Sequence, residues 1–73
     1  MTSTTLRFRL NGEHAEIAAG ATVADAVALL LEDEHPKGVA VSLDRCVVPR
    51  SEWASTPVRA GSLVEVVSAA AGG

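Results

Sequence analysis

The segment at residues 6–10 alternates apolar and basic side chains and runs directly into the pair Asn11-Gly12. Alternation with a period of two indicates a strand with one buried face. Asn-Gly after such a segment is the strongest short-range signal for a β-hairpin, because a type I′ turn needs two residues that tolerate positive φ. The sequence therefore predicts a hairpin whose return strand covers residues 13–17. The side chains expected to face the core are Leu6, Phe8, Leu10, Ala15 and Ile17.

A helix is expected after the hairpin, beginning at Thr22. The Thr22 hydroxyl can accept a hydrogen bond from the amide of Asp25, which is an acidic form of the capping box. The acidic run at residues 32–34 is unfavourable for the carboxyl end of a helix dipole, so we expect the helix to stop there. Apolar residues recur at helical spacing and form one stripe that should pack on a sheet. This stripe consists of Val23, Ala26, Val27, Leu30 and Leu31.

The second half of the chain predicts three further strands. Residues 39–43 alternate and form the first of them, and a turn at residues 44–45 leads to a short edge strand at residues 46–48, which a proline ends. A loop with one short helical turn at residues 51–54 precedes the last strand, residues 63–67. The first and last strands are the natural parallel central pair of a ubiquitin-like β-grasp. The predicted fold class is thus α+β, a mixed sheet with one helix packed across one face.

Composition limits the remaining possibilities. The chain has 73 residues, of which 48% are hydrophobic and 21% charged, which indicates one small globular domain. Its net charge is −3 and its six basic residues are scattered, so nucleic-acid binding is not expected. A single cysteine, Cys46, allows no intrachain disulfide and fits a cytoplasmic location. No apolar run is long enough to predict a membrane-spanning helix.

The sequence offers no catalytic constellation. His14 and His35 stand isolated, and the acidic run at residues 32–34 is interpreted as a solvated helix end. Cys46 has only Arg45 beside it in the sequence to favour a reactive thiol, so we interpret it as a small strand residue. We therefore expect no enzyme, no metal site and no cofactor.

The chain ends in Gly72-Gly73. We predict a domain over residues 1–67 and a mobile C-terminal arm over residues 68–73. The α-carboxylate of Gly73 is the one functional group on such a reachable arm. A carboxylate becomes an acyl donor only after activation, usually as an acyl-adenylate, and glycines without Cβ atoms suit a narrow enzyme channel.

The most specific motif is Val47-Val48-Pro49-Arg50-Ser51-Glu52-Trp53, which matches a V-P-R-x-x-W pattern. With this motif and several shorter segments, the chain resembles the ThiS group of sulfur carrier proteins of thiamine biosynthesis over essentially its whole length. The terminal Gly-Gly and the β-grasp are shared with molybdopterin-synthase small subunits and ubiquitin-like modifiers. The other matching pieces are Leu10-Asn11-Gly12-Glu13, Ala19-Gly20-Ala21-Thr22-Val23, Gly38-Val39-Ala40-Val41 and the ending from Gly61 to Gly72-Gly73.

This resemblance implies a protein without a cofactor that serves as a substrate for other enzymes. An adenylating enzyme of the ubiquitin-activating type would use ATP to activate Gly73 and would recognise Gly72 and Ala71 in the arm. Sulfur, supplied indirectly by a cysteine desulfurase, would then give a thiocarboxylate. Thiazole synthase would accept that sulfur while building the thiazole of thiamine.

A docking surface for these partners is expected on the last strand. Leu63 and Val67 should face away from the helix, and Arg7 and Arg9 could ring them. Singly scattered apolar surface residues are the alternative interpretation. Trp53 could anchor a partner, but as the only tryptophan it is expected to pack its loop over the sheet edge.

Three other functions remain open at this point. The chain could be a protein modifier joined through Gly73 to lysines of targets. It could be the small subunit of molybdopterin synthase, which uses the same thiocarboxylate. It could also be an interaction module with an inert tail, in which case removing Gly73 would cost nothing.

Overall fold

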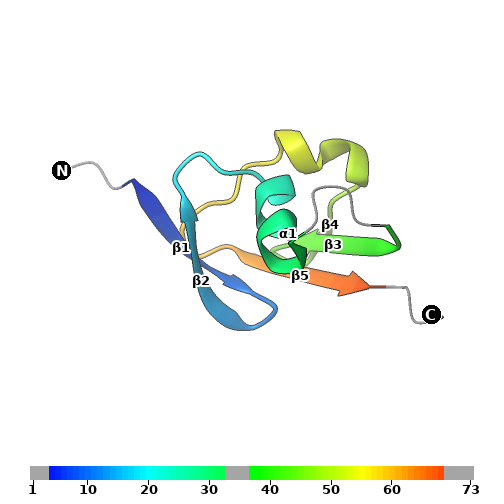
Figure 1. Ribbon diagram of the computed structural model, residues 1–73, viewed down its shortest axis with the longest axis horizontal. Coiled ribbons are helices and arrows are strands. Elements are labelled where there is room, and N and C mark those ends of the chain that lie inside the picture. Colours follow the sequence, from blue (N-terminus) through cyan, green and yellow to red (C-terminus); the bar gives the residue numbers. More distant parts are fainter. Residues whose placement is uncertain (1–3, 33–36, 69–73) are drawn as a thin grey trace.

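The computed structural model describes residues 4–32 and 37–68. It contains a mixed five-stranded sheet in the order β2-β1-β5-β3-β4, with the helix α1 packed against it (Figure 1). The predicted succession of elements is confirmed. The elements are β1 (Thr5–Leu10), β2 (Glu13–Ala18), α1 (Val23–Leu31), β3 (Val39–Leu43), β4 (Cys46–Val47), the 3₁₀ helix η1 (Arg50–Ser55) and β5 (Leu63–Ser68).

The first and last strands lie side by side at the centre of the sheet, as predicted. β1 and β5 are parallel, with Arg9 opposite Leu63 and Leu10 opposite Val64. β2 pairs with β1, and β3 pairs with β5 and β4, all antiparallel. This arrangement is the β-grasp fold, in which β5 is bordered by a strand on each side.

Two tight turns shape the sheet. Asn11 and Gly12 both have positive φ, at 52° and 84°, as the predicted type I′ hairpin requires. Asp44 and Arg45 also have positive φ, at 50° and 73°, and join β3 to the edge strand β4. Each turn thus begins with Asn or Asp, the non-glycine residues that tolerate this conformation best.

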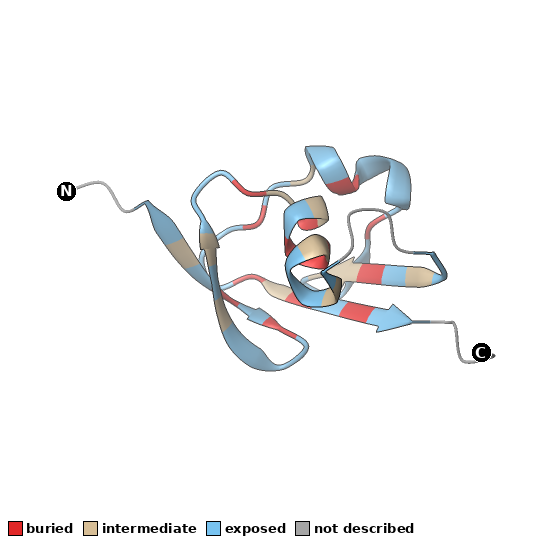
Figure 2. Cartoon of the chain, viewed as in Figure 1, coloured by how far each residue is buried: buried red, intermediate tan, exposed pale blue. Residues whose placement is uncertain are grey.

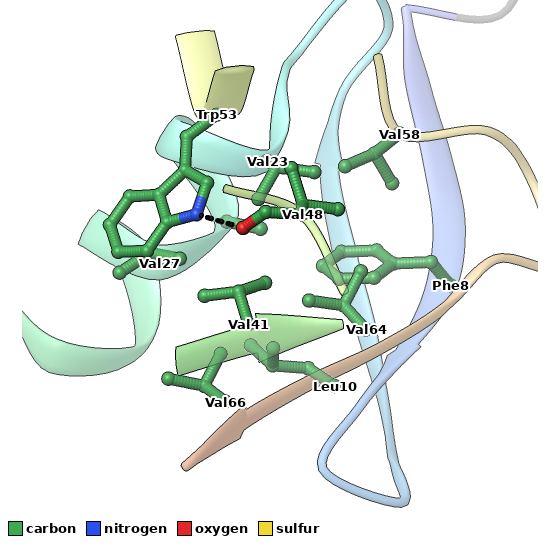
Figure 3. Close-up of a cluster of buried hydrophobic side chains, with 11 residues drawn as sticks. Phe8, Leu10, Val23, Val27, Val41, Val48, Trp53, Val58, Val64 and Val66 are labelled. Atoms are coloured by element: carbon green, nitrogen blue, oxygen red, sulfur yellow. Dashed lines mark hydrogen bonds between the residues drawn. The ribbon is translucent and has the colours of Figure 1, made fainter. Parts of the chain in front are cut away.

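The core lies between α1, η1 and one face of the sheet (Figure 3). The predicted cap of α1 is present, because the Thr22 hydroxyl accepts from the Asp25 amide and the Asp25 carboxylate accepts from the Thr22 amide. Buried residues alternate with exposed ones along the strands (Figure 2). The buried cluster comprises Phe8, Leu10, Val23, Ala26, Val27, Val41, Val48, Trp53, Val58, Val64 and Val66.

The prediction that Leu30 belongs to the core is wrong. Leu30 remains 37% exposed, although its helical position places it on the same stripe as the fully buried Val23. It stands in the last turn of the nine-residue helix, beside a shallow hollow of about 230 Å³ that the β1–β2 hairpin leaves open. Helical spacing sets only the side of the helix to which a side chain points. Burial also requires that another element pack against the helix at that turn. Leu31 instead packs partly against the core.

Candidate docking face and C-terminal strand

The sheet has one face that neither helix covers in the described part of the chain. α1 and η1 both contribute buried side chains to the core on the opposite side. Strand register places the outward-facing residues of all five strands together on this open face. They are His14, Glu16 and Ala18 of β2, Thr5, Arg7 and Arg9 of β1, Leu63, Glu65 and Val67 of β5, Ala40 and Ser42 of β3, and Val47 of β4.

The side of the open face formed by β5, β3 and β4 is apolar apart from Ser42 and Glu65, where the Ser42 hydroxyl donates a hydrogen bond to Glu65 Oε1 at 3.3 Å. Val67 is 62% exposed and Val47 is 77% exposed, the two highest values among the exposed large apolar side chains of the described residues. Ala40 is exposed and pairs with Val67 from the neighbouring strand β3. Leu63 is half-buried and lies on the same face of β5, four residues before Val67. We call Ala40, Val47, Leu63 and Val67 the apolar patch.

The structure places Leu63 and Val67 on the open face, as the sequence predicts. Ala40 and Val47 were missed, because their place depends on how β3 registers with β4 and β5. The alternation of side chains along residues 46–48 could have indicated the position of Val47. Val48 is buried, so its neighbour Val47 points to the opposite face of the sheet.

The other side of the open face is basic. Arg7 forms an ion pair with Glu16, with 3.3 Å between Nε and Oε2. Arg9 lies between His14 and Leu63 in the sheet register, and within residues 4–32 and 37–68 it makes no ion pair. Arg9 therefore presents a cation directly beside the apolar patch, while the charge of Arg7 is shared with a carboxylate.

The central strand β5 leads towards the C-terminus. It extends to Ser68, one residue beyond the predicted end. The predicted modification site Gly73, and the arm residues Ala71 and Gly72, lie outside the described residues. Five residues follow Ser68 in the sequence, which can span at most about 18 Å when fully extended.

The V-P-R-x-x-W motif has a structural role. Trp53 is only 6% exposed, and its indole Nε1 donates a hydrogen bond to the Val48 carbonyl at 2.9 Å (Figure 3). The Arg50 guanidinium lies 4.5 Å from the centre of the Trp53 ring. The interpretation of Trp53 as a packing residue is thus confirmed. The predicted helical turn is present and longer than expected, as η1.

Other site types find little support in the described segments. In residues 4–32 and 37–68 there is no group of three or more His, Cys, Asp or Glu side chains that could hold a metal ion. No helix in the same residues is long and apolar enough to cross a membrane. Cys46 is exposed on β4.

Comparison with known proteins decides the family. The ThiS family model matches residues 8–73, which include the terminal Gly-Gly and the open face from Arg9 onward. The chain belongs to the ThiS family. Members of this family are sulfur carrier proteins of thiamine biosynthesis rather than enzymes, as the sequence motifs indicate.

The fold of this ThiS-family protein is also found in a solved structure. A crystal structure described as thiamine biosynthesis protein (ThiS) from Geobacter metallireducens aligns with a TM-score of 0.72 and 23% identity. The alignment covers 86% of this chain and 93% of the other. None of the curated proteins compared with this ThiS-family chain matches it.

Proposed function

We propose that this protein carries sulfur as a thiocarboxylate on Gly73 and delivers it for thiazole formation in thiamine biosynthesis. The observation that supports this most is that the family match runs to the last residue and so includes the Gly72-Gly73 ending. The single cysteine favours a reducing, cytoplasmic setting for this chemistry.

The reaction needs two substitutions that partner enzymes perform. A carboxylate oxygen of Gly73 attacks the α-phosphorus of ATP, and pyrophosphate leaves. A sulfur nucleophile, supplied ultimately from cysteine by a desulfurase, then replaces AMP at the acyl carbon. The resulting thiocarboxylate is a better nucleophile than the carboxylate because sulfur is soft and weakly solvated. Thiazole synthase accepts this sulfur.

The chain itself contributes recognition. We assign partner docking to Leu63 and Val67 of the apolar patch, with Arg7 and Arg9 at its border. Exposed apolar residues next to charged ones are typical of interaction surfaces, in which a few buried anchors supply most of the binding energy. The adenylating enzyme would close a narrow channel around Ala71 and Gly72, because at Gly72 the backbone carries no Cβ.

The decisive experiment changes only the end of the chain. Variants with one residue added after Gly73, with Gly73 deleted, or with Gly72→Val are assayed by ATP–pyrophosphate exchange with the adenylating enzyme of the same organism. Each added residue moves the carboxylate by about 3.3–3.6 Å, and an error of 1 Å can cost about 10²-fold in rate. We expect exchange to be abolished by the extension and the deletion, and impaired by Gly72→Val.

Two further measurements complete this test. Thermal melts should be unchanged within a few tenths of a kcal/mol, since the buried cluster of the described residues is formed without the changed positions. Intact-mass analysis of protein from its native host should show one oxygen replaced by sulfur. Full exchange by the extended protein would refute the carrier function and favour an inert tail, and isopeptide-linked ladders would identify a protein modifier.

A further inference from the structure

The strand β2 forms one edge of the sheet, and no described strand pairs with its outer side (Figure 1). Its register with β1 decides which backbone groups face outward. Leu10 and Glu13 flank the two-residue hairpin turn, so they form a hydrogen-bonded pair, and such pairs recur at every second residue. The backbone N–H and C=O groups of His14 and Glu16 lie between these pairs and therefore point towards the free edge.

The accessible part of this edge is short and lies at residues 14–16. Beyond it, the Ala18 carbonyl accepts a hydrogen bond from the Ala21 amide at 3.0 Å within the turn that follows β2. The other edge of the sheet offers less, because β4 has two residues and leads through Val48 into Pro49, which has no amide hydrogen. Unpaired edge strands accept further strands, so β2 is the edge at which the described sheet can grow.

Side-chain charge selects the strand that fits this edge. An antiparallel copy of β2 forms backbone hydrogen bonds only where outward-pointing residues face one another. Either His14 then faces His14, or Glu16 faces Glu16, or His14 of each copy faces Glu16 of the other. Like side chains meet in the first two registers, whereas the last pairs a basic with an acidic side chain at both positions. In this register both backbone pairs exchange their N–H···O bonds, and Ala15 faces Ala15 on the two-fold axis.

The surroundings of the edge suit this register. On the open face, the exposed Glu16 carboxylate has Arg7 on one side, with 3.3 Å between Nε and Oε2, and the free edge on the other. The imidazole of His14 can donate an N–H to that carboxylate in either protonation state. On the inner face, Ala15 is small and lines the shallow hollow beside Leu30, so no large side chain stands at the two-fold axis.

We propose that the chain self-associates through β2 into a two-fold dimer in which His14 of each copy pairs with Glu16 of the other. The two sheets join edge to edge, with both open faces on the same side. The apolar patch lies on β5, β3 and β4, away from this edge, so it stays accessible in the dimer. The inference therefore does not rest on the proposed function. Because the contact is small, we expect a Kd of about 0.1–1 mM.

Sedimentation equilibrium between about 10 µM and about 2 mM tests the association. Glu16→Lys should weaken it roughly 3- to 30-fold, since each dimer contains the His14–Glu16 pair twice. Glu52→Lys makes the same change in net charge at an exposed position of η1 and should leave Kd within about two-fold. Adding His14→Glu to Glu16→Lys exchanges the two charges and should restore association.

Cysteine cross-linking identifies the register. In a Cys46→Ser background, Ala15→Cys brings the thiols of two copies opposite each other, with Cα atoms about 4.5 Å apart, which a disulfide can bridge. Mild oxidation should link Ala15→Cys at least about five-fold faster than Glu13→Cys, although Glu13 is the more exposed position. Glu13→Cys should instead link to Ile17→Cys when the two proteins are mixed, because these positions face each other across the axis.

Several results would overturn the inference. A protein that stays monomeric up to about 2 mM would show that the charges on β2 serve to keep this edge unpaired. Unchanged association of Glu16→Lys, or faster linking of Ala15→Cys to Glu13→Cys or Ile17→Cys than to itself, would refute the register. None of these results concerns ATP–pyrophosphate exchange, so the proposed function would stand. Absence of exchange would refute the proposed function and leave self-association unaffected.

Discussion

The indole Nε1 of Trp53 donates a hydrogen bond to the carbonyl oxygen of Val48 at 2.9 Å, within the most specific motif of the sequence. Both residues are buried, at 6% and 8% exposure, and Pro49 lies between Val48 and η1. The bond ties η1 to the chain leaving the edge strand β4. The motif that identifies the family at the sequence level therefore acts in this protein by closing the core.

Replacing Trp53 with Phe should destabilise the fold. The change leaves the buried Val48 carbonyl without its donor, which typically costs about 1–3 kcal/mol. Urea unfolding measures this loss. Arg50→Ala is the comparison: it removes the cation–π contact over the face of the Trp53 ring and keeps the indole hydrogen bond, and for the cation–π contact about 0.5–1 kcal/mol is expected. A stable Trp53→Phe protein that fails to bind its adenylating enzyme would instead make Trp53 a partner anchor.

Two positions on the helix stripe should respond differently to truncation. Val27 is 1% exposed, so Val27→Ala loses about two buried methyl groups and leaves a cavity, at a cost of about 2 kcal/mol. Leu30→Ala removes more atoms from a half-open site and should cost less. Thermal melts should show a fall in Tm of roughly 8–16 °C for Val27→Ala. A larger fall for Leu30→Ala would contradict the placement of Leu30 beside an open hollow.

An acidic side chain in the apolar patch should weaken docking. Val67→Asp is expected to raise the Kd for the adenylating enzyme or for thiazole synthase by roughly 5- to 30-fold, since an anchor at an interface is typically worth about 1–2 kcal/mol. Isothermal titration measures the affinity. Ala54→Asp, exposed on η1 away from the open face, is the matched control and should bind normally. Unchanged affinity of Val67→Asp for both partners would rule out the patch as a docking site.

The two arginines of β1 should differ in their effect on association. Arg9→Ala is expected to slow association about two- to five-fold at low salt and to flatten its salt dependence, because charges at an interface rim act mainly on the association rate. Arg7→Ala should have a smaller effect, since Arg7 already pairs with Glu16 within the chain. Stopped-flow binding at several salt concentrations separates them. Equal effects of both variants would show that the Glu16 ion pair is irrelevant to docking.

Local chemistry made much of this fold predictable. The positive φ of Asn11 and Gly12, the capping box of Thr22 and Asp25, and the alternation along each strand all depend on residues close together in the sequence. Turn conformation, cap and pleat are set by neighbours within a few positions, so the sequence carries their signal directly. The family and its Gly-Gly ending could likewise be identified from short motifs.

Only the tertiary structure decided which residues meet across the sheet. The apolar patch gains Ala40 and Val47 through strand register, and Leu30 loses burial because the hairpin leaves a hollow beside it. The hydrogen bond between the Asn11 side chain and the Val66 amide joins residues 55 positions apart, and no local pattern encodes such a contact. The sequence by itself determined the elements and the family. Tertiary packing decided which residues contact one another across these elements. Burial and non-local hydrogen bonds depend on which residues of distant segments lie next to each side chain in the folded chain.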